Sequence, residues 1–135
     1  MASAHEVVDC VAFMLVDDGR ILVEKRSAHK QLLPGVLAIP GGHVDAGETP
    51  EAALVRELRE ELDVSASEFV YICTLMHHAD ESRRIHYYLV EQWVGEMVAL
   101  EAESLHWLPF ADLHQLVLDI DVEAVERYWA RASDR

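Results

Sequence analysis

Three glutamates, Glu57, Glu60 and Glu61, stand close together in a segment with the apolar pattern of a helix. Side chains three and four residues apart share one face of a helix, so these carboxylates are expected to be neighbours that repel each other. A bound cation would remove that repulsion, and hard ions such as Mg²⁺ take oxygen ligands while also holding phosphate groups. The spacing therefore predicts a metal site for phosphate chemistry; the alternative is an ordinary solvated helix face.

The helix that carries the glutamates has a clear start signal. Thr49 offers a hydroxyl for the N-cap, and Pro50 fits the first helical position. The helix is expected to continue through about Leu62, with an apolar stripe formed by Leu54, Val55, Leu58 and Leu62. The glutamates lie beside this stripe, so we expect them to be half-buried, which strengthens metal binding by partly excluding competing water.

The rest of the chain alternates between strand-like and turn-like segments. A hairpin turn is expected at residues 17–20, and polar loops at 27–36 and 77–84. Strands are expected at residues 7–16, 21–24, 36–39, 69–76, 85–94 and 104–108, and closing helices at 111–118 and 122–131. This order of elements indicates an α/β or α+β sandwich.

Length and composition indicate one globular domain over residues 1–135. With 51% hydrophobic residues the chain can form a core, and no apolar run approaches the ~20 residues that span a bilayer. The N-terminus lacks the basic start and apolar core of a signal peptide, so we expect a cytoplasmic protein with no membrane partner. Cys10 and Cys73 are expected to be buried free thiols.

The chain is strongly acidic, with 25 Asp and Glu against 11 Lys and Arg and a formal net charge of −14. A nucleic-acid partner would require a basic patch, so none is expected. An enzyme for anionic substrates would face the same repulsion, unless a bound cation inverts the sign of the local field. The acidity is therefore compatible with phosphate chemistry only at a metal site.

The segment 42–64 resembles the Nudix box, which has a glycine, a glutamate and the run Arg-Glu-apolar-x-Glu-Glu-x-Gly-apolar at fixed spacing. Six fixed positions are in register: Gly42, Glu48, Arg56, Glu57, Glu60 and Glu61. Leu58 and Val64 fill the two apolar positions, and Asp63 stands where the family usually has glycine. Asp tolerates a left-handed backbone better than most residues, so we expect a modest loss of stability and intact chemistry.

The resemblance to the Nudix family implies a fold and a reaction. Nudix domains are α/β/α sandwiches with a mixed sheet, in which the box forms a loop–helix–loop motif beneath the substrate cleft. Family members cleave a pyrophosphate bond in a nucleoside diphosphate linked to another group, so Mg²⁺ is the expected cofactor, with Mn²⁺ as a substitute. The small size favours a MutT-like nucleoside triphosphatase that releases a monophosphate and pyrophosphate; 8-oxo-dGTP is one candidate substrate.

Other functions within the fold stay open. One alternative is a nucleotide-sugar, ADP-ribose or dinucleoside polyphosphate hydrolase, because substrate choice in the family depends on loops outside the box. Another is a non-catalytic nucleotide-binding sensor, although such a domain would be expected to lose box glutamates. Dimers are common in the family, so a homodimer is a further expectation.

By the same resemblance, Glu57, Glu60 and Glu61 are the metal ligands, and either Glu60 or Glu57 doubles as the base that orients water. Arg56 belongs to the catalytic motif, where it is expected to pair with Glu60 or with Glu48 and to hold the loop. Gly41 and Gly42 leave the backbone unobstructed, so Gly41 is expected to lie against the substrate, and in the family a carbonyl near Gly42 can bind metal; the alternative for both glycines is a tight turn.

Further site residues are expected outside the box. MutT-like proteins often carry a phosphate-contacting arginine after the second strand, which points to Arg26; the alternative is a solvated strand end. His43 follows the glycines and is positioned to face the cleft; the alternative is a surface histidine. A loop before the tryptophan-bearing strand often supplies another metal ligand, here Glu103 or Glu101, with Glu103 favoured.

Aromatic and histidine residues give weaker signals. Residues 37–38, Leu-Ala, stand where many MutT-like proteins have an aromatic residue, so base stacking would have to come from Tyr87 or Phe13. His77, His78 and His86 match no zinc-binding spacing, and no metal is assigned to them.

Overall fold

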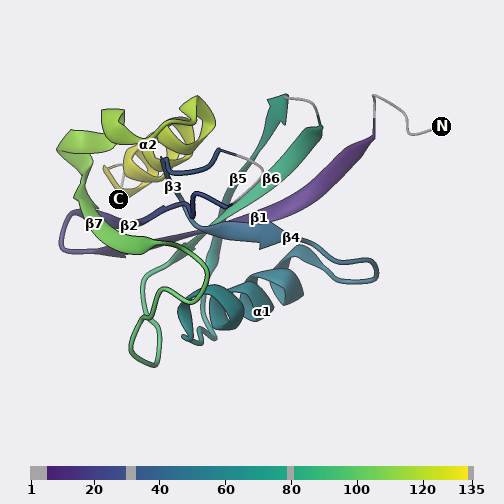
Figure 1. Cartoon of the computed structure of the whole chain (residues 1–135). Coiled ribbons are helices and arrows are strands. Elements are labelled where there is room, and N and C mark those ends of the chain that lie inside the picture. Colours follow the sequence, from purple (N-terminus) through teal and green to yellow (C-terminus); the bar gives the residue numbers. More distant parts are fainter. Residues whose placement is uncertain (1–5, 30–32, 79–80, 134–135) are drawn as a thin grey trace.

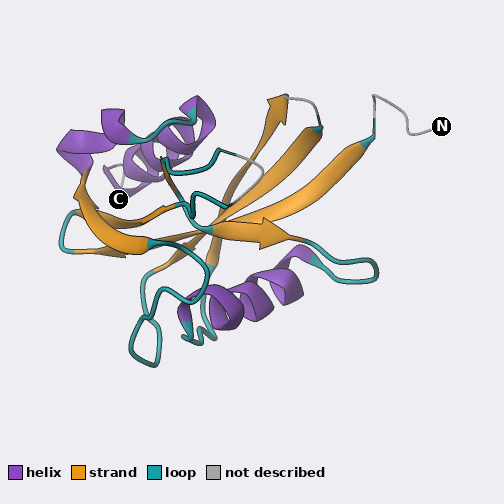
Figure 2. Cartoon of the chain, in the orientation of Figure 1, coloured by secondary structure: helices purple, strands orange, loops and turns teal. Residues whose placement is uncertain are grey.

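The computed structural model describes residues 6–29, 33–78 and 81–133. In this part of the chain a mixed seven-stranded sheet lies between two helical layers (Figure 1; Figure 2). The strands are β1 Val7–Asp17, β2 Arg20–Lys25, β3 Leu37–Ala38, β4 Gly41–His43, β5 Val70–His78, β6 Ser82–Val90 and β7 Ser104–Pro109. The helices are α1 Pro50–Leu62, the 3-10 helix η1 Phe110–Gln115 and α2 Asp119–Ser133. The predicted α/β/α sandwich with a mixed sheet is confirmed.

The central strand β1 connects the two halves of the sheet. The main order is β3-β2-β1-β6-β5, while β4 pairs with β1 and β7 pairs with β2. β1 and β6 are parallel, and the other pairs are antiparallel. Because β1 pairs with β2 only at its end, the Gly-rich β4 can pair with the middle of β1, at residues 10–12.

The residues of β1 alternate between the two layers. Ala12 and Met14 belong to the core beneath α2, whereas Val11, Phe13 and Leu15 belong to the core that α1 covers. A strand that is buried on both faces needs apolar residues at consecutive positions. This explains why the sequence shows an almost unbroken apolar run here instead of an alternating pattern.

Helix α1 begins and ends as the sequence indicates. The Thr49 hydroxyl accepts a hydrogen bond from the Ala52 amide at 3.1 Å, and Pro50 is the first helical residue. Leu54, Leu58 and Leu62 are fully buried against the sheet. Asp63 ends the helix with a left-handed backbone, at a φ of 58° and a ψ of 34°.

Several predicted boundaries need correction. Strands β5 and β6 continue into the predicted polar loop 77–84, because a hairpin can extend past the core with polar side chains. The loop predictions at 27–36 and 77–84, like the predicted N-terminal features, fall partly outside the described residues. The strand predicted at 85–94 ends at Val90, and Val94 makes only an isolated bridge to Ser65. The helix predicted at 111–118 is a short 3-10 helix, and β4 was missed because glycines carry no apolar pattern.

The structure also bears on the two cysteines and on the expected absence of a membrane-spanning helix. Cys10 and Cys73 are buried free thiols, as predicted. None of the helices in the described ranges has the length and apolar character needed to cross a bilayer.

The left-handed residue at the end of α1 gives a first prediction. Asp63→Ala should lower the free energy of unfolding by about 1 kcal/mol, because Ala tolerates this backbone less well than Asp, whereas Asp63→Gly should not lower it. Urea unfolding of both variants would test this, with Ser67→Ala in the exposed segment after the helix as the control. An Ala variant as stable as the wild type would contradict the expectation.

Candidate active site

Arg56 on α1 is surrounded by oxygen acceptors. Its guanidinium donates two hydrogen bonds to Glu48, at 2.8 and 2.9 Å, and one to the His43 carbonyl at 2.9 Å. One nitrogen, Nη1, also donates to both Glu57 at 2.8 Å and Glu60 at 2.9 Å. The hydrogen bonds from Arg56 hold the pKa of Glu48 at about 2. Arg56 thus pairs with both predicted partners and ties the loop after β4 to the helix.

Three carboxylates form a cluster at the buried edge of α1. Oxygen atoms of Glu57, Glu61 and Glu101 all lie within 4.8 Å of one another. Glu57 and Glu61 are only 8% and 5% exposed, while Glu101 comes from the exposed loop before β7. Burial raises the pKa of Glu57, an effect opposed by its contact with Arg56. Oxygen ligands at this spacing, in a partly dry setting, suit a hard divalent cation.

The two glycines of β4 allow the sheet and the helix to approach the cluster closely. A Cβ atom on Gly42 would lie 2.3 Å from the Glu57 carboxylate, and one on Gly41 would lie 2.1 Å from the Val11 carbonyl oxygen. Real Cβ contacts are never that short, so any side chain here would displace Glu57 or β1. Glycine at position 42 is therefore required by packing against the Glu57 carboxylate, and glycine at position 41 by packing against the backbone of β1.

Two of the predicted ligands lie elsewhere. Glu60 is outside the cluster, with a side chain that is 51% exposed and bonded to Arg56. Glu103, which the sequence analysis favoured over Glu101, points to Lys25 at 3.1 Å with a side chain that is 54% exposed. The two acidic residues of this loop could not be separated by sequence, because only the path of the loop decides which one reaches α1.

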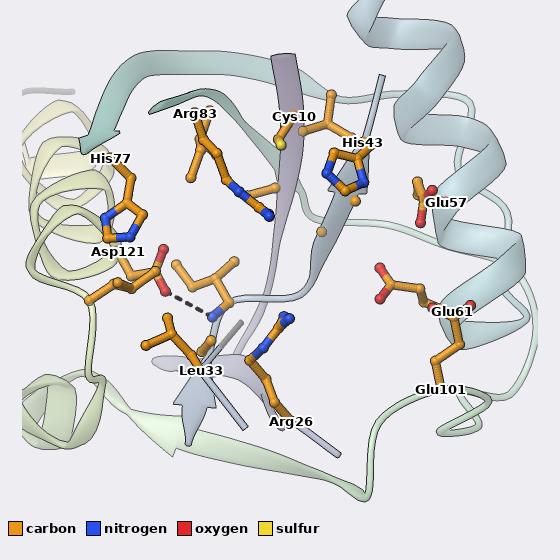
Figure 3. Close-up of a pocket in the computed structure, with 18 residues that line it drawn as sticks. Cys10, Arg26, Leu33, His43, Glu57, Glu61, His77, Arg83, Glu101 and Asp121 are labelled. Carbon is orange, nitrogen blue, oxygen red and sulfur yellow. Dashed lines mark hydrogen bonds between the residues drawn. The ribbon is translucent and has the colours of Figure 1, made fainter. Parts of the chain in front are cut away.

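A cavity of about 300 Å³ lies beside the carboxylate cluster. Figure 3 shows Glu57, Glu61 and Glu101 along one wall, with Arg26 and His43 approaching the cavity from different elements. Gly41 and Gly42 also line it. The cavity therefore brings together the carboxylate cluster and the three residues that the sequence predicts for substrate contact: Arg26, His43 and Gly41.

The far wall of the cavity holds residues that sequence reasoning missed. Arg83, His77 and Asp121 lie opposite the carboxylates, with Cys10 nearby (Figure 3). Arg83 and His77 fell in a segment predicted to be a loop, which hid their strand alternation. Asp121 precedes a predicted helix and had no distinguishing pattern, so only the packing of α2 on the sheet reveals it.

Asp121 joins α2 to the segment that leads into β4. Its two carboxylate oxygens accept hydrogen bonds from the Ile39 amide at 3.1 Å and from the Tyr87 hydroxyl at 2.6 Å. Burial raises the pKa of Asp121 to about 6, although the two hydrogen bonds that its carboxylate accepts oppose this effect. The side chain is 3% exposed, so it acts mainly as a buried connection beneath the cavity.

The expectation for aromatic stacking was wrong. Tyr87 and Phe13 are both completely buried in the core, where neither ring face is open to a nucleotide base. His86 lies on the opposite sheet face, with Nε2 3.0 Å from Asp9 and Nδ1 2.9 Å from Thr74. Within the described ranges, no group of three candidate metal ligands includes a histidine.

Comparison with known proteins decides the family. The NUDIX domain family model matches residues 5–130. The chain belongs to the Nudix family. It is 31% identical over 134 residues to the CTP pyrophosphohydrolase of Escherichia coli, covering 96% of this chain and 97% of that protein. It is also 31% identical over 99 residues to the 8-oxo-dGTP diphosphatase of the same bacterium, covering 73% and 76%.

Solved structures agree with this assignment. A MutT NUDIX hydrolase from Burkholderia pseudomallei matches this Nudix chain with a TM-score of 0.83 and 29% identity, over 91% of this chain and 98% of the other. The protein is thus an enzyme, a Nudix pyrophosphohydrolase of the MutT type that acts on nucleotides. The comparisons favour this function over the non-catalytic sensor.

The buried Asp121 predicts a pH dependence of stability in this Nudix enzyme. The folded state holds the Asp121 proton more tightly than the unfolded chain, because the pKa rises from 3.8 to about 6 on folding. The contribution of Asp121 to stability is therefore largest below pH 4 and should fall by up to about 3 kcal/mol as the pH rises through 6. Urea unfolding between pH 4 and 7 should show that the free energy of unfolding falls more in the wild type than in Asp121→Asn. A difference in stability between the two proteins that is the same at every pH does not affect this comparison. An equal fall in the two proteins would contradict the prediction.

Proposed function

We propose that this Nudix enzyme hydrolyses a nucleoside triphosphate to a nucleoside monophosphate and pyrophosphate, and that it requires Mg²⁺, for which Mn²⁺ can substitute. The observation that carries the proposal is the cluster of Glu57, Glu61 and Glu101 on the wall of a cavity large enough for part of a nucleotide. The names of the two Escherichia coli relatives support a triphosphate substrate. We further propose that residues 1–135 form one domain, in line with the family match over 5–130.

In this proposal the carboxylate cluster holds the metal. Glu57, Glu61 and Glu101 supply the oxygen ligands, and backbone near Gly42 lies beside them. A divalent ion at this place would neutralise charge on the phosphate oxygens as the pyrophosphate bond breaks. Such an ion also accounts for an acidic protein that binds an anionic substrate, because it inverts the sign of the local field.

The remaining residues position the substrate and the attacking water. Arg26 and His43 line the cavity and are proposed to donate hydrogen bonds to phosphate oxygens. Glu60 is proposed to act as the base, which orients a water molecule and takes its proton. Arg56 bonds Glu60 and Glu57 through the same nitrogen, so it positions the base next to a metal ligand without touching substrate.

Product analysis tests the reaction itself. Purified protein with Mg²⁺ is expected to convert at least one nucleoside triphosphate to equal amounts of monophosphate and pyrophosphate, as resolved by ion-exchange chromatography. The panel should include 8-oxo-dGTP, ADP-ribose, nucleotide sugars and diadenosine polyphosphates, because these are the alternatives within the family. Release of inorganic phosphate in place of pyrophosphate, or turnover of the diphosphate-linked compounds alone, would refute the triphosphatase.

Separate substitutions should distinguish the ligands from the base. Glu57→Gln and Glu101→Gln should raise the Mg²⁺ concentration for half-maximal rate by at least about tenfold, because each removes a charged ligand. Glu60→Gln should instead lower kcat at saturating Mg²⁺ by about 10²–10⁴, the usual contribution of a general base. Rates measured across a Mg²⁺ titration provide both quantities.

The controls are glutamates outside the carboxylate cluster. Glu96→Gln, in an exposed loop segment, removes one charge without touching the cluster and should leave both quantities unchanged. Glu103→Gln tests the rival ligand and should also have no effect, since Glu103 pairs with Lys25. A Mg²⁺ requirement that rises with Glu103→Gln and not with Glu101→Gln would reverse the assignment. Full turnover by Glu60→Gln would eliminate Glu60 as the base.

A further inference from the structure

Arg83 extends into the cavity from the wall opposite the carboxylate cluster (Figure 3). It lies near the start of β6, where side chains alternate between the two faces of the sheet. Arg83 and Ile85 line the cavity, whereas Arg84 and His86 face the other side and contact Asp9. The strand therefore presents one arginine to the cavity and a chemically identical neighbour to the opposite face.

Two described neighbours contact the guanidinium of Arg83: the exposed carboxylate of Glu81 and the buried thiol of Cys10. The Nε of Arg83 lies 3.3 Å from a carboxylate oxygen of Glu81, whose side chain is 50% exposed. The Arg83 side chain itself is 22% exposed. The two Nη groups lie beyond Nε along the side chain, so the pairing with Glu81 orients the donor edge of the guanidinium toward the cavity.

The surroundings of Arg83 suit a nucleotide base better than a phosphate. Apolar residues from several elements line the cavity together with Arg83: Ala12, Leu33, Ile39, Ile85 and Leu118. Apolar walls with a few placed polar groups are typical of sites for flat, neutral ring systems. The phosphates belong at the other wall, where a metal held by Glu57, Glu61 and Glu101 would bind them.

We propose that Arg83 binds the base of the substrate and makes the enzyme selective for guanine or cytosine. This inference rests on the proposed function, because it assumes that the phosphates lie at the carboxylate cluster. It concerns selectivity among bases, which neither the box residues nor the proposed chemistry determines.

The choice of base follows from the hydrogen-bonding groups of arginine. A guanidinium has only donors, arranged as a fork that matches two adjacent acceptors. Guanine offers such a pair in O6 and N7, and cytosine offers one in O2 and N3. On adenine, the amino group is a donor and lies beside both N1 and N7. On uracil, the N3–H donor lies between the two carbonyl oxygens. Neither base therefore offers two adjacent acceptors to the fork of arginine.

The test compares GTP, CTP, ATP and UTP as substrates of the wild type, Arg83→Met and Arg83→Lys. The wild type should have higher kcat/KM for GTP or CTP than for ATP and UTP. Arg83→Met should lower kcat/KM for the preferred nucleotide by at least about tenfold and affect ATP and UTP much less, because a bidentate contact is lost. Arg83→Lys keeps the charge without the fork and should lose the same selectivity.

Arg84→Met is the matched control, since it removes an arginine from the same strand on the opposite face. It should leave the order of the four nucleotides unchanged. An equal loss for all four with Arg83→Met would mean that Arg83 contacts the ribose or phosphates, and it would overturn the proposal. Unchanged selectivity in that variant would overturn it as well.

Measuring nucleotide dissociation constants alongside turnover separates the two proposals. If the wild type binds nucleotides and hydrolyses none of them, the proposed function fails. The role of Arg83 is still tested in that case, because the ratio of the GTP and ATP dissociation constants can be compared between the wild type and Arg83→Met. If it hydrolyses triphosphates without preferring guanine or cytosine, only the inference about Arg83 fails. Absence of both binding and turnover would overturn both.

Discussion

The candidate active site depends on one positively charged side chain, that of Arg56, placed among several carboxylates. Arg56 donates to Glu48, Glu57 and Glu60 and to the carbonyl of His43, so a single guanidinium offsets the repulsion between carboxylates that share a helix face. The same contacts attach the loop after β4 to α1. Because the fork of arginine has fixed geometry, the positions of the carboxylates are determined relative to that loop.

Close packing beside Arg56 determines where the carboxylates lie relative to the sheet. The glycines of β4 let that strand lie against β1 on one side and against the Glu57 carboxylate on the other. Glu57 and Glu61 are consequently buried, which raises the pKa of Glu57 and reduces competition from water for a cation. The glycines of β4 and the buried carboxylates of α1 line the same cavity.

The two layers of the sandwich contribute different parts of the cavity. Helix α1 and the loop before β7 bring the carboxylates, whereas the wall opposite consists of β5, β6 and the start of α2. Asp121 connects that wall to Ile39 and hence to the segment that enters β4. The arrangement places the carboxylate cluster and Arg83 on elements far apart in the chain, so under our proposals the reaction and the selectivity among bases could vary separately.

The sequence by itself determined the local features of this protein. The cap at Thr49, the left-handed Asp63, the buried run of β1 and the register of Arg56 with the box glutamates all follow from interactions between residues near in the chain. Short-range geometry of helices and strands is enough to predict these features, whereas the family and its general chemistry followed from the resemblance of residues 42–64 to the Nudix box.

Only the tertiary structure decided which distant residues lie beside the box carboxylates. It placed Glu101, and not Glu103, in the carboxylate cluster, because the path of a loop with no repeating pattern brings one carboxylate to α1 and the other to Lys25. It buried Tyr87 and Phe13 in the core and placed Arg83 and Asp121 at the cavity. These outcomes depend on how α2 packs on the sheet, how β6 pairs with β1 within it and how the loop before β7 runs. Contacts between such distant segments leave no periodic signal in the sequence.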